Sequence, residues 1–401
     1  MPLEKPIEQV AEADLLTLIE NGVSEWKTID YKLTLPGKSD GDRKEFLGDV
    51  SSFANASGGH LVYGMREEVR EGRKVPVELS GVESGDADAA VLSCESSIRD
   101  GIRPRIPGVV ARPVKLENGK AAFVIRVPRS FASPHMVTYG GSSRFYARNS
   151  NGKYPMDVDE IRAAFLLSDR VAERVRDFRL DRIAKIQADE TPVPLPPVAR
   201  VVLHVVPLDA FSAGKRFDPA FLADLDPGRV PLYPLGKTEG WSGSRYNLEG
   251  VVRYRLSAAS GSASAYLQIF RDGSLEGVNA SLLEPREGRH RVPSIAFEES
   301  VLNSALRYAQ SLRRLQVDAP LAFMLTLLGV SQYRISYQGG SPGFEGDAFR
   351  KDVILIPALV VENYDADLAS AMKPTFDMVW NAAGWAKSMC YDEAGRRRSF
   401  R

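Results

Sequence analysis

Apolar residues recur along the first part of the chain with two spacings, one typical of helices and one of strands. The three-to-four-residue spacing predicts helices over residues 12–20, 42–55, 86–98 and 157–167. Runs rich in β-branched and aromatic residues predict strands over 24–35, 60–65, 109–116, 121–127 and 143–148. Asn118-Gly119 between two of these strands predicts a hairpin, since this dipeptide suits a tight β-turn. The pattern favours an α+β domain over residues 1–168.

The rest of the chain predicts a connection and a second domain. Over 169–198 the helical pattern continues towards Arg182 and then gives way to TPVPLPPVA, a proline-rich linker. Residues 199–401 are expected to form a second α+β domain with an unassigned, sensor or regulatory role. Its strands are predicted at 201–206, 250–256, 263–271, 321–328 and 353–361, and its helices at 298–315 and 374–389. The tail GRRRSFR is expected to be frayed.

Composition excludes several classes of protein. With 44% hydrophobic and 26% charged residues, the chain is not a largely disordered one. Two cysteines and four histidines, with no metal-ligand spacing among them, argue against a disulfide framework and a structural zinc site. No apolar stretch approaches the roughly 20 residues that cross a bilayer, and the N-terminus lacks a signal pattern. We therefore expect a cytoplasmic protein with no membrane partner.

The formal net charge of zero hides an uneven distribution. Residues 99–150 hold ten basic residues and two acidic ones, a segment charge of +8, and eight of the ten are arginines. Arginine suits phosphate, so the segment predicts a nucleic-acid partner. Pairing with acidic residues elsewhere is the alternative. If their strands are neighbours, some of these arginines share a sheet surface with Tyr146. The candidate phosphate contacts are Arg103, Arg105, Arg126, Arg144 and Arg148.

Glu25, Asp30 and Lys32 form the sharpest local constellation of candidate catalytic residues. In a strand, side chains two residues apart point the same way, so Asp30 and Lys32 project from one face. A carboxylate and a lysine in this register suit a metal-dependent nuclease, in which Mg²⁺ or Mn²⁺ is the cofactor and the lysine stabilises charge on phosphate. Glu67 or Glu68, after the next buried strand, would supply a further metal ligand. The alternative is an exposed acid–base pair of the kind common on strands.

An ordered series of motifs resembles the Schlafen family and its AlbA-like domain, over about residues 24–168. The motifs match the family's E-x-x-x-x-E-[FY]-K, its F-A-N…G-G segment, a short x-G-V, an I-x-P segment and a Y-x-R strand. In this chain they are Glu25…Asp30-Tyr31-Lys32, SFANASGGHLVYGM at 52–65, Leu79-Ser80-Gly81-Val82, Ile102-Arg103-Pro104 and Phe145-Tyr146-Ala147-Arg148. The sequence departs from the family at Asp30, where Glu is usual, and at Arg66, where the family has the first of two acids.

The resemblance implies an AlbA-like mixed sheet with helices and a nucleic-acid partner. It implies a metal-dependent endoribonuclease that acts on structured RNA such as tRNA, with Glu25, Asp30 and the Glu67/Glu68 region as the acids. A role in antiviral, anti-phage defence is expected from relatives with a distinct C-terminal domain.

Two other classes of function stay open on the sequence. One is a non-catalytic regulatory protein that binds RNA or DNA and whose acids are structural. The other is a scaffold or sensor in which the basic segment meets an acidic protein surface. A homo-oligomer is expected if the substrate cradle is larger than one small domain.

Overall fold

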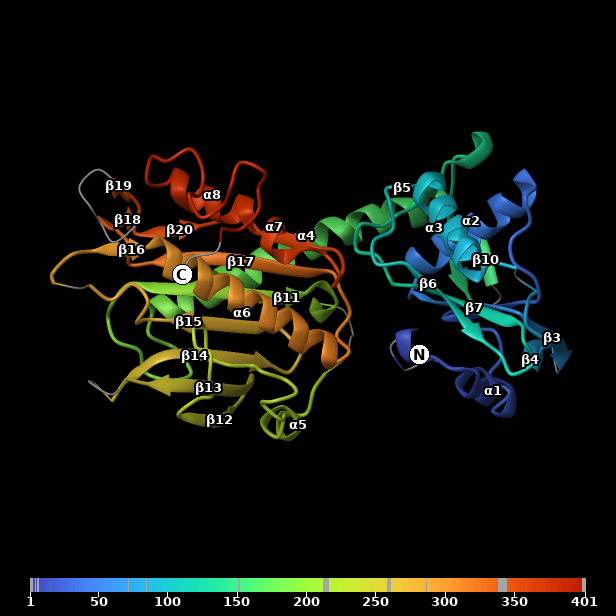
Figure 1. The fold of residues 1–401 in the computed structure, drawn as a ribbon, viewed down its shortest axis with the longest axis horizontal. Helices are drawn as coiled ribbons and strands as arrows, with labels where there is room; N and C mark the ends of the chain where they lie inside the picture. The colour runs from blue at the N-terminus through green and yellow to red at the C-terminus, as the bar shows by residue number, and fades with distance from the viewer. Residues whose placement is uncertain are drawn as a thin grey trace. The chain divides into compact units, whose positions relative to one another are not determined.

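The computed structural model describes residues 3, 5, 7–70, 72–83, 85–150, 152–211, 216–257, 261–285, 287–337 and 345–398. The chain divides into two compact units, Met1–Ala172 and Glu173–Arg401. Both units combine helices with strands (Figure 1), which confirms the predicted α+β class. The end of the basic tail, residues 399–401, lies outside the described residues.

The first unit contains three sheets. Their strand orders are β1-β2-β7-β6, β10-β9-β8-β5 and the hairpin β3-β4. The strands are β1 (Ile29–Lys32), β2 (Gly59–Tyr63), β3 (Met65–Arg70), β4 (Arg73–Leu79), β5 (Ile102–Arg103), β6 (Val110–Lys115), β7 (Ala121–Val127), β8 (Met136–Val137), β9 (Arg144–Asn149) and β10 (Gly152–Pro155). The helices are the 3-10 turns η1 (Ile7–Gln9) and η2 (Tyr139–Gly141) and the α-helices α1 (Glu12–Glu20), α2 (Asp40–Ala54) and α3 (Ala87–Gly101).

The sheet containing β1 and β2 is covered on both faces, so its alternating side chains enter two separate cores. On one face, Leu61 and Phe123 pack with apolar residues of α2 and α3. On the other face, Val62 and Val124 pack with α1. Asp30 is in register with Leu61 and therefore projects towards the α2 side. Helix α2 also packs against β9 of the second sheet.

The second unit is built on one large sheet with the strand order β12-β13-β14-β15-β11-β17-β20, and β21 also pairs with β17. These strands are β11 (Arg200–Pro207), β12 (Gly243–Asn247), β13 (Gly250–Leu256), β14 (Ala263–Phe270), β15 (Leu275–Asn279), β17 (Leu321–Leu328), β20 (Val353–Leu355) and β21 (Leu359–Val361). A smaller sheet joins β16 (Arg291–Pro293), β18 (Arg334–Ser336) and β19 (Glu345–Ala348). The helices are α4 (Val158–Gln187), which enters from the first unit, η3 (Leu208–Phe211), α5 (Pro219–Ala223), α6 (Ser294–Arg314), α7 (Leu368–Ala371) and α8 (Lys373–Asn381).

Helix α6 and the C-terminal half of α4 cover opposite faces of the large sheet. Figure 1 shows α6 crossing in front of the strands, where Val301 and Leu312 join the larger core. On the other face, Arg182 of α4 donates two hydrogen bonds to the fully buried Glu276 of β15, at 2.8 and 2.9 Å. His204 and Tyr266 also contact this carboxylate. This buried network fixes the end of α4 to the sheet.

Several elements differ from the prediction, three of them for identifiable reasons. The strand predicted at 353–361 is two short strands, because Pro357 interrupts it and cannot donate to the ladder. The helix predicted at 374–389 ends at Asn381, shortly before Gly384 with its φ of +81°. The hairpin β3-β4 was not predicted, because charged residues on both faces conceal its alternation.

Within the described parts of the chain, no helix combines the length and the apolar character that a membrane crossing requires.

Candidate active site

The candidate site begins with Asp30 and Lys32 on β1. Their side chains project from the same face, and Lys32 Nζ lies 2.9 Å from Asp30 Oδ1. Asp30 is only 3% exposed, so its charge must be balanced by neighbours rather than by water. Lys32 retains about a third of its side-chain exposure and can still meet a ligand from solvent.

The second cation on Asp30 is Arg148 of β9. Its guanidinium pairs with Asp30 Oδ2 and lies over the ring of Phe53, 4.2 Å from the ring centroid. Burial opposes the ionisation of Asp30, but the charges of Arg148 and Lys32 outweigh it and lower the pKa of Asp30 to about 2. Asp30 is therefore a carboxylate at neutral pH. The Arg148 side chain is 2% exposed and holds that carboxylate in place, so it does not form part of the arginine surface predicted from the sequence.

The hairpin β3-β4 brings Glu67 and Lys74 to Glu25. Gly64 makes this possible: its φ is +87°, and a Cβ there would lie 2.9 Å from the backbone of Gly81. The Glu25 amide donates to the Lys74 carbonyl at 2.9 Å. Lys74 Nζ then lies 2.5 Å from Glu67 Oε1 and 3.5 Å from Glu25 Oε2. Glu25 and Glu67, 42 positions apart, thus share one lysine.

The surroundings of Glu25 raise the pKa of its carboxyl group. Burial and the adjacent carboxyl groups of Asp30 and Glu67 raise its pKa to about 8, although its Oε1 accepts a hydrogen bond from the Tyr31 amide at 3.1 Å. Glu67 Oε2 is buried and accepts no hydrogen bond from any described residue. Glu25, Asp30 and Glu67 therefore form a group of acids in which one proton is retained near neutral pH.

Glu68, the alternative to Glu67 on the sequence, lies elsewhere. It pairs with Arg66 at 2.9 Å and with Arg70 at 3.6 Å, and about half of its side chain is exposed. The structure therefore brings Glu67, and not Glu68, to Glu25 and Asp30.

Asp49 of α2 is a further acid at the site, which sequence reasoning missed. It is 3% exposed and pairs with Lys153 of β10 at 3.0 Å. Burial raises its pKa, and Asp30 adds to this effect. Its position three residues after Phe46 and four before Phe53 places it on the apolar face of α2. A charged residue among the apolar positions of this helix was the sequence feature that could have identified Asp49 as part of the site.

The other arginines predicted to contact phosphate do not lie together on one sheet surface. Arg126 is on β7 of one sheet, while Arg144 is on β9 of another, so the condition for a shared sheet surface is not met. Arg103, Arg105 and Arg144 are exposed, and Arg126 is half-buried. The phosphate contacts predicted for these four residues stay a prediction.

Metal-ion geometry is not preformed at the site. Among the described residues, no group of three or more histidines, cysteines, aspartates or glutamates is arranged so that it could hold an ion. The acids Glu25, Asp30 and Glu67 are instead held together by Lys32, Lys74 and Arg148.

Comparison with protein families identifies the part of the chain that carries this site. Residues 25–157 match the family described as Schlafen, AlbA_2. This segment is a Schlafen AlbA_2 domain. The match confirms the resemblance seen in the sequence and indicates a nucleic-acid-related function for the segment. Glu25, Asp30, Glu67 and Arg148 all lie within the Schlafen AlbA_2 domain, whereas residues 158–401 lie beyond the match.

Two solved structures are similar to this chain at low identity. One is the N-terminal domain of a RecG-related protein from Nitrosomonas europaea, at 22% identity, with a TM-score of 0.27, covering 35% of this chain and 89% of that one. The other is the DIP2311 protein from Corynebacterium diphtheriae, at 21% identity and a TM-score of 0.22, covering 36% of this chain and 27% of that one. No curated protein matches the chain.

Proposed function

We propose that the protein is a divalent-metal-dependent endoribonuclease that acts on structured RNA, with tRNA as the first substrate to test. The observation that carries the proposal is the meeting of Glu25, Asp30 and Glu67 beside Lys32. Three carboxyl groups and a lysine are side chains that suit metal-assisted phosphodiester cleavage, in which acids hold the ion and a cation stabilises charge on phosphate.

The acids fit a divalent cation by their chemistry. Mg²⁺ and Mn²⁺ prefer carboxylate oxygens, and the buried Glu67 Oε2 without a hydrogen-bond donor is an oxygen that a cation would satisfy. Glu25, Asp30 and Glu67 would hold the ion, which supplies charge stabilisation at phosphate and a more acidic water.

The protein's own residues prepare the site in three ways. Arg148 keeps Asp30 ionised and fixes its orientation. Lys32, which pairs with Asp30 and is partly exposed, would stabilise negative charge that develops on a phosphate. The exposed Arg103, Arg105 and Arg144 would bind the RNA backbone through salt-sensitive contacts.

The test is incubation of the full chain with end-labelled tRNA, in Mn²⁺, in Mg²⁺ and in EDTA. We expect metal-dependent cleavage that Asp30→Asn and Glu67→Gln each reduce by at least about a hundredfold, comparable to the loss of one group that stabilises transition-state charge. Asp88→Asn, at an exposed position on α3, is the matched control and should cleave normally. Circular dichroism checks that each variant is folded. If Asp30→Asn does not fold, Glu67→Gln still tests the proposal, because Glu67 is more exposed than Asp30. Full activity of a folded Asp30→Asn variant would refute the assignment.

A non-catalytic nucleic-acid-binding protein is the second candidate, and the ion pairs favour it. Lys32 and Arg148 neutralise Asp30, and Lys74 neutralises Glu67, so these acids have structural partners without a metal. This candidate predicts RNA or DNA binding that weakens with salt and no cleavage under any metal condition. The incubation above therefore separates the two functions.

A further inference from the structure

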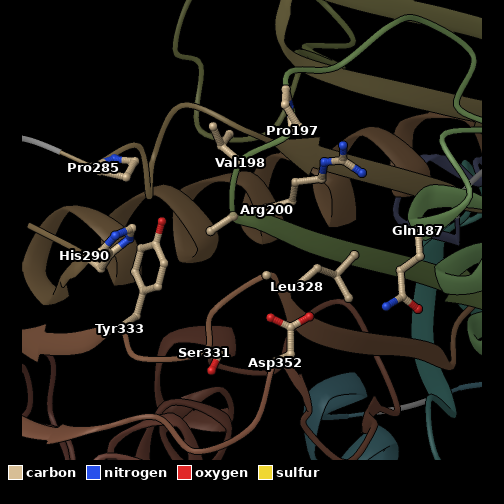
Figure 2. A pocket seen from close by; sticks show the side chains of 12 residues that line it. Gln187, Pro197, Val198, Arg200, Pro285, His290, Leu328, Ser331, Tyr333 and Asp352 are labelled. Carbon is tan, nitrogen blue, oxygen red and sulfur yellow. The ribbon is translucent and has the colours of Figure 1, made fainter. Parts of the chain in front are cut away.

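The second unit contains a cavity of about 450 Å³ at one end of the large sheet. It lies where β11 begins, β17 ends and the chain enters β20, and the end of α4 contributes Gln187. Figure 2 shows the side chains around it, including Arg200, Tyr333 and Asp352. The volume lies in the range of small-molecule sites.

Backbone contacts fix the loop between β17 and β18 that forms one wall. Gly329 has a φ of +69°, and a Cβ there would lie 3.3 Å from the Cα of Ala199, so the two backbones approach closely. The Val330 amide donates to the Asp352 carbonyl at 3.1 Å. Phe349 donates its amide to the Tyr333 carbonyl at 2.8 Å. The positions of Tyr333 and Asp352 are thus set before any ligand arrives.

Tyr333 presents a hydroxyl group to the cavity. The residue is only 3% exposed, its ring meets the edge of His290 at 5.0 Å between centroids, and Figure 2 shows its hydroxyl pointing into the cavity. No described residue makes a hydrogen bond to that hydroxyl. Solvent in the cavity reaches this hydroxyl, so a ligand atom can take the place of water as its hydrogen-bond partner.

Other polar groups converge on the same space. The side chains of Asp352, Ser331 and Gln187 line it without a hydrogen bond to any described residue. They offer an acceptor-only carboxylate, a hydroxyl and an amide. The apolar part of the lining comes from Val198, Leu328 and two prolines. A flat ring with both donors and acceptors on its edge satisfies this combination, whereas a simple alkylamine leaves the donors unpaired.

The charges in the lining disfavour a phosphate group. Arg200 is the cationic side chain of the lining, and its terminal nitrogens already donate to Ile186, Asp189 and Pro196. Its Nε is buried and makes no hydrogen bond to any described residue. Asp352 would repel an anion, and its two oxygens instead suit a ring edge with two adjacent N–H donors. Guanine presents such an edge.

We propose that this cavity is a binding site for a guanine nucleoside, with Asp352 accepting from the two N–H groups of the base and Tyr333 hydrogen-bonding a second polar atom of the ligand. The proposal concerns the second unit and stands whether or not the first unit cleaves RNA. The proposal assigns a ligand of defined chemistry to the second unit, which lies outside the residues that match the family.

The test is isothermal titration of the full chain with guanosine, inosine, adenosine and inorganic phosphate. Guanosine should bind, and inosine, which lacks the 2-amino group, should bind about tenfold more weakly, the effect of one hydrogen bond to a charged group. Adenosine and phosphate should bind more weakly still. Absence of guanosine binding at millimolar concentration, or equal binding of adenosine or phosphate, would overturn the proposal.

Variants locate the site. Asp352→Asn should weaken guanosine binding by at least about tenfold and Tyr333→Phe by about fivefold, while both keep the shape of the side chain they replace. Glu239→Gln, an exposed acid-to-amide change elsewhere in the unit, should leave the affinity unchanged. Guanosine binding that neither Asp352→Asn nor Tyr333→Phe alters would show that the cavity is not the site.

Discussion

Replacing Lys74 by methionine should make the candidate active site bind Mn²⁺ more tightly. Lys74 Nζ lies 2.5 Å from Glu67 Oε1 and 3.5 Å from Glu25 Oε2, so its charge occupies the position between two proposed metal ligands. A divalent ion must compete with this ammonium group. Methionine keeps most of the length of the side chain and removes the charge.

The size of the effect follows from the exposure of the lysine. Two unit charges about 4 Å apart interact by roughly 4 kcal/mol at an effective dielectric constant of 20. The Lys74 side chain is about half exposed, and exposed ion pairs contribute about 1 kcal/mol or less. We therefore expect an intermediate change of about 1–2 kcal/mol, which is a five- to thirtyfold increase in Mn²⁺ affinity.

The assay is calorimetric titration of the full chain with Mn²⁺ at pH 8, together with thermal unfolding. Lys74→Arg retains the charge and should resemble the wild type, and Lys115→Met on β6 removes an exposed lysine from another strand. Without metal, Lys74→Met should be slightly less stable than the wild type, and Mn²⁺ should restore the difference. Unchanged Mn²⁺ affinity in Lys74→Met would refute the competition, whereas no Mn²⁺ binding in any variant would refute the metal site itself.

Two further predictions concern the same cluster. Arg148→Met should lower the free energy of unfolding, measured in urea, by about 3–5 kcal/mol, because it leaves Asp30 buried with one cation fewer. Arg144→Met, at the exposed start of the same strand, is the control and should change the free energy of unfolding by less than about 0.5 kcal/mol. Similar effects of the two substitutions would show that Asp30 does not depend on Arg148. Glu25→Gln should gain stability over the wild type as pH rises, because a folded-state pKa of about 8 against an ordinary value of 4.5 makes ionisation of Glu25 unfavourable to folding. Melting temperatures should coincide near pH 4, diverge between about 4.5 and 8 and stay apart above that, and a constant difference across this range would contradict the raised pKa.

Local patterns in the sequence predicted the parts of the fold that depend on neighbouring residues. Asn118-Gly119 connects β6 to β7 as predicted, and the helix predicted from residue 86 begins there, where Asp86 caps α3 by accepting from the Ala89 amide. Asp30 and Lys32 share a face because strand alternation requires it. These features need only a few residues of context.

The rest of the site depends on contacts between distant segments. Glu25 meets Glu67 only because a hairpin rich in charged residues folds back to Gly81, and charged residues on both faces of that hairpin conceal its hydrophobic alternation. Arg148 was predicted to face phosphate because nothing in a strand sequence distinguishes an exposed arginine from one buried on a carboxylate. In the structure Arg148 is buried between Asp30 and the ring of Phe53, which come from distant segments of the chain.

The β9 strand connects the binding surface proposed here with the acid cluster. Arg144 stands exposed at its first residue, and Arg148, four residues later, is buried on Asp30. At about 3.3 Å per residue, the two positions lie roughly 13 Å apart along the strand. A backbone phosphate bound at Arg144 would thus lie on the order of 13 Å along the strand from the arginine that pairs with Asp30. On the proposed function the +8 segment would have two roles: its exposed arginines would bind substrate, and Arg148 keeps ionised the carboxylate on which the proposed cleavage depends.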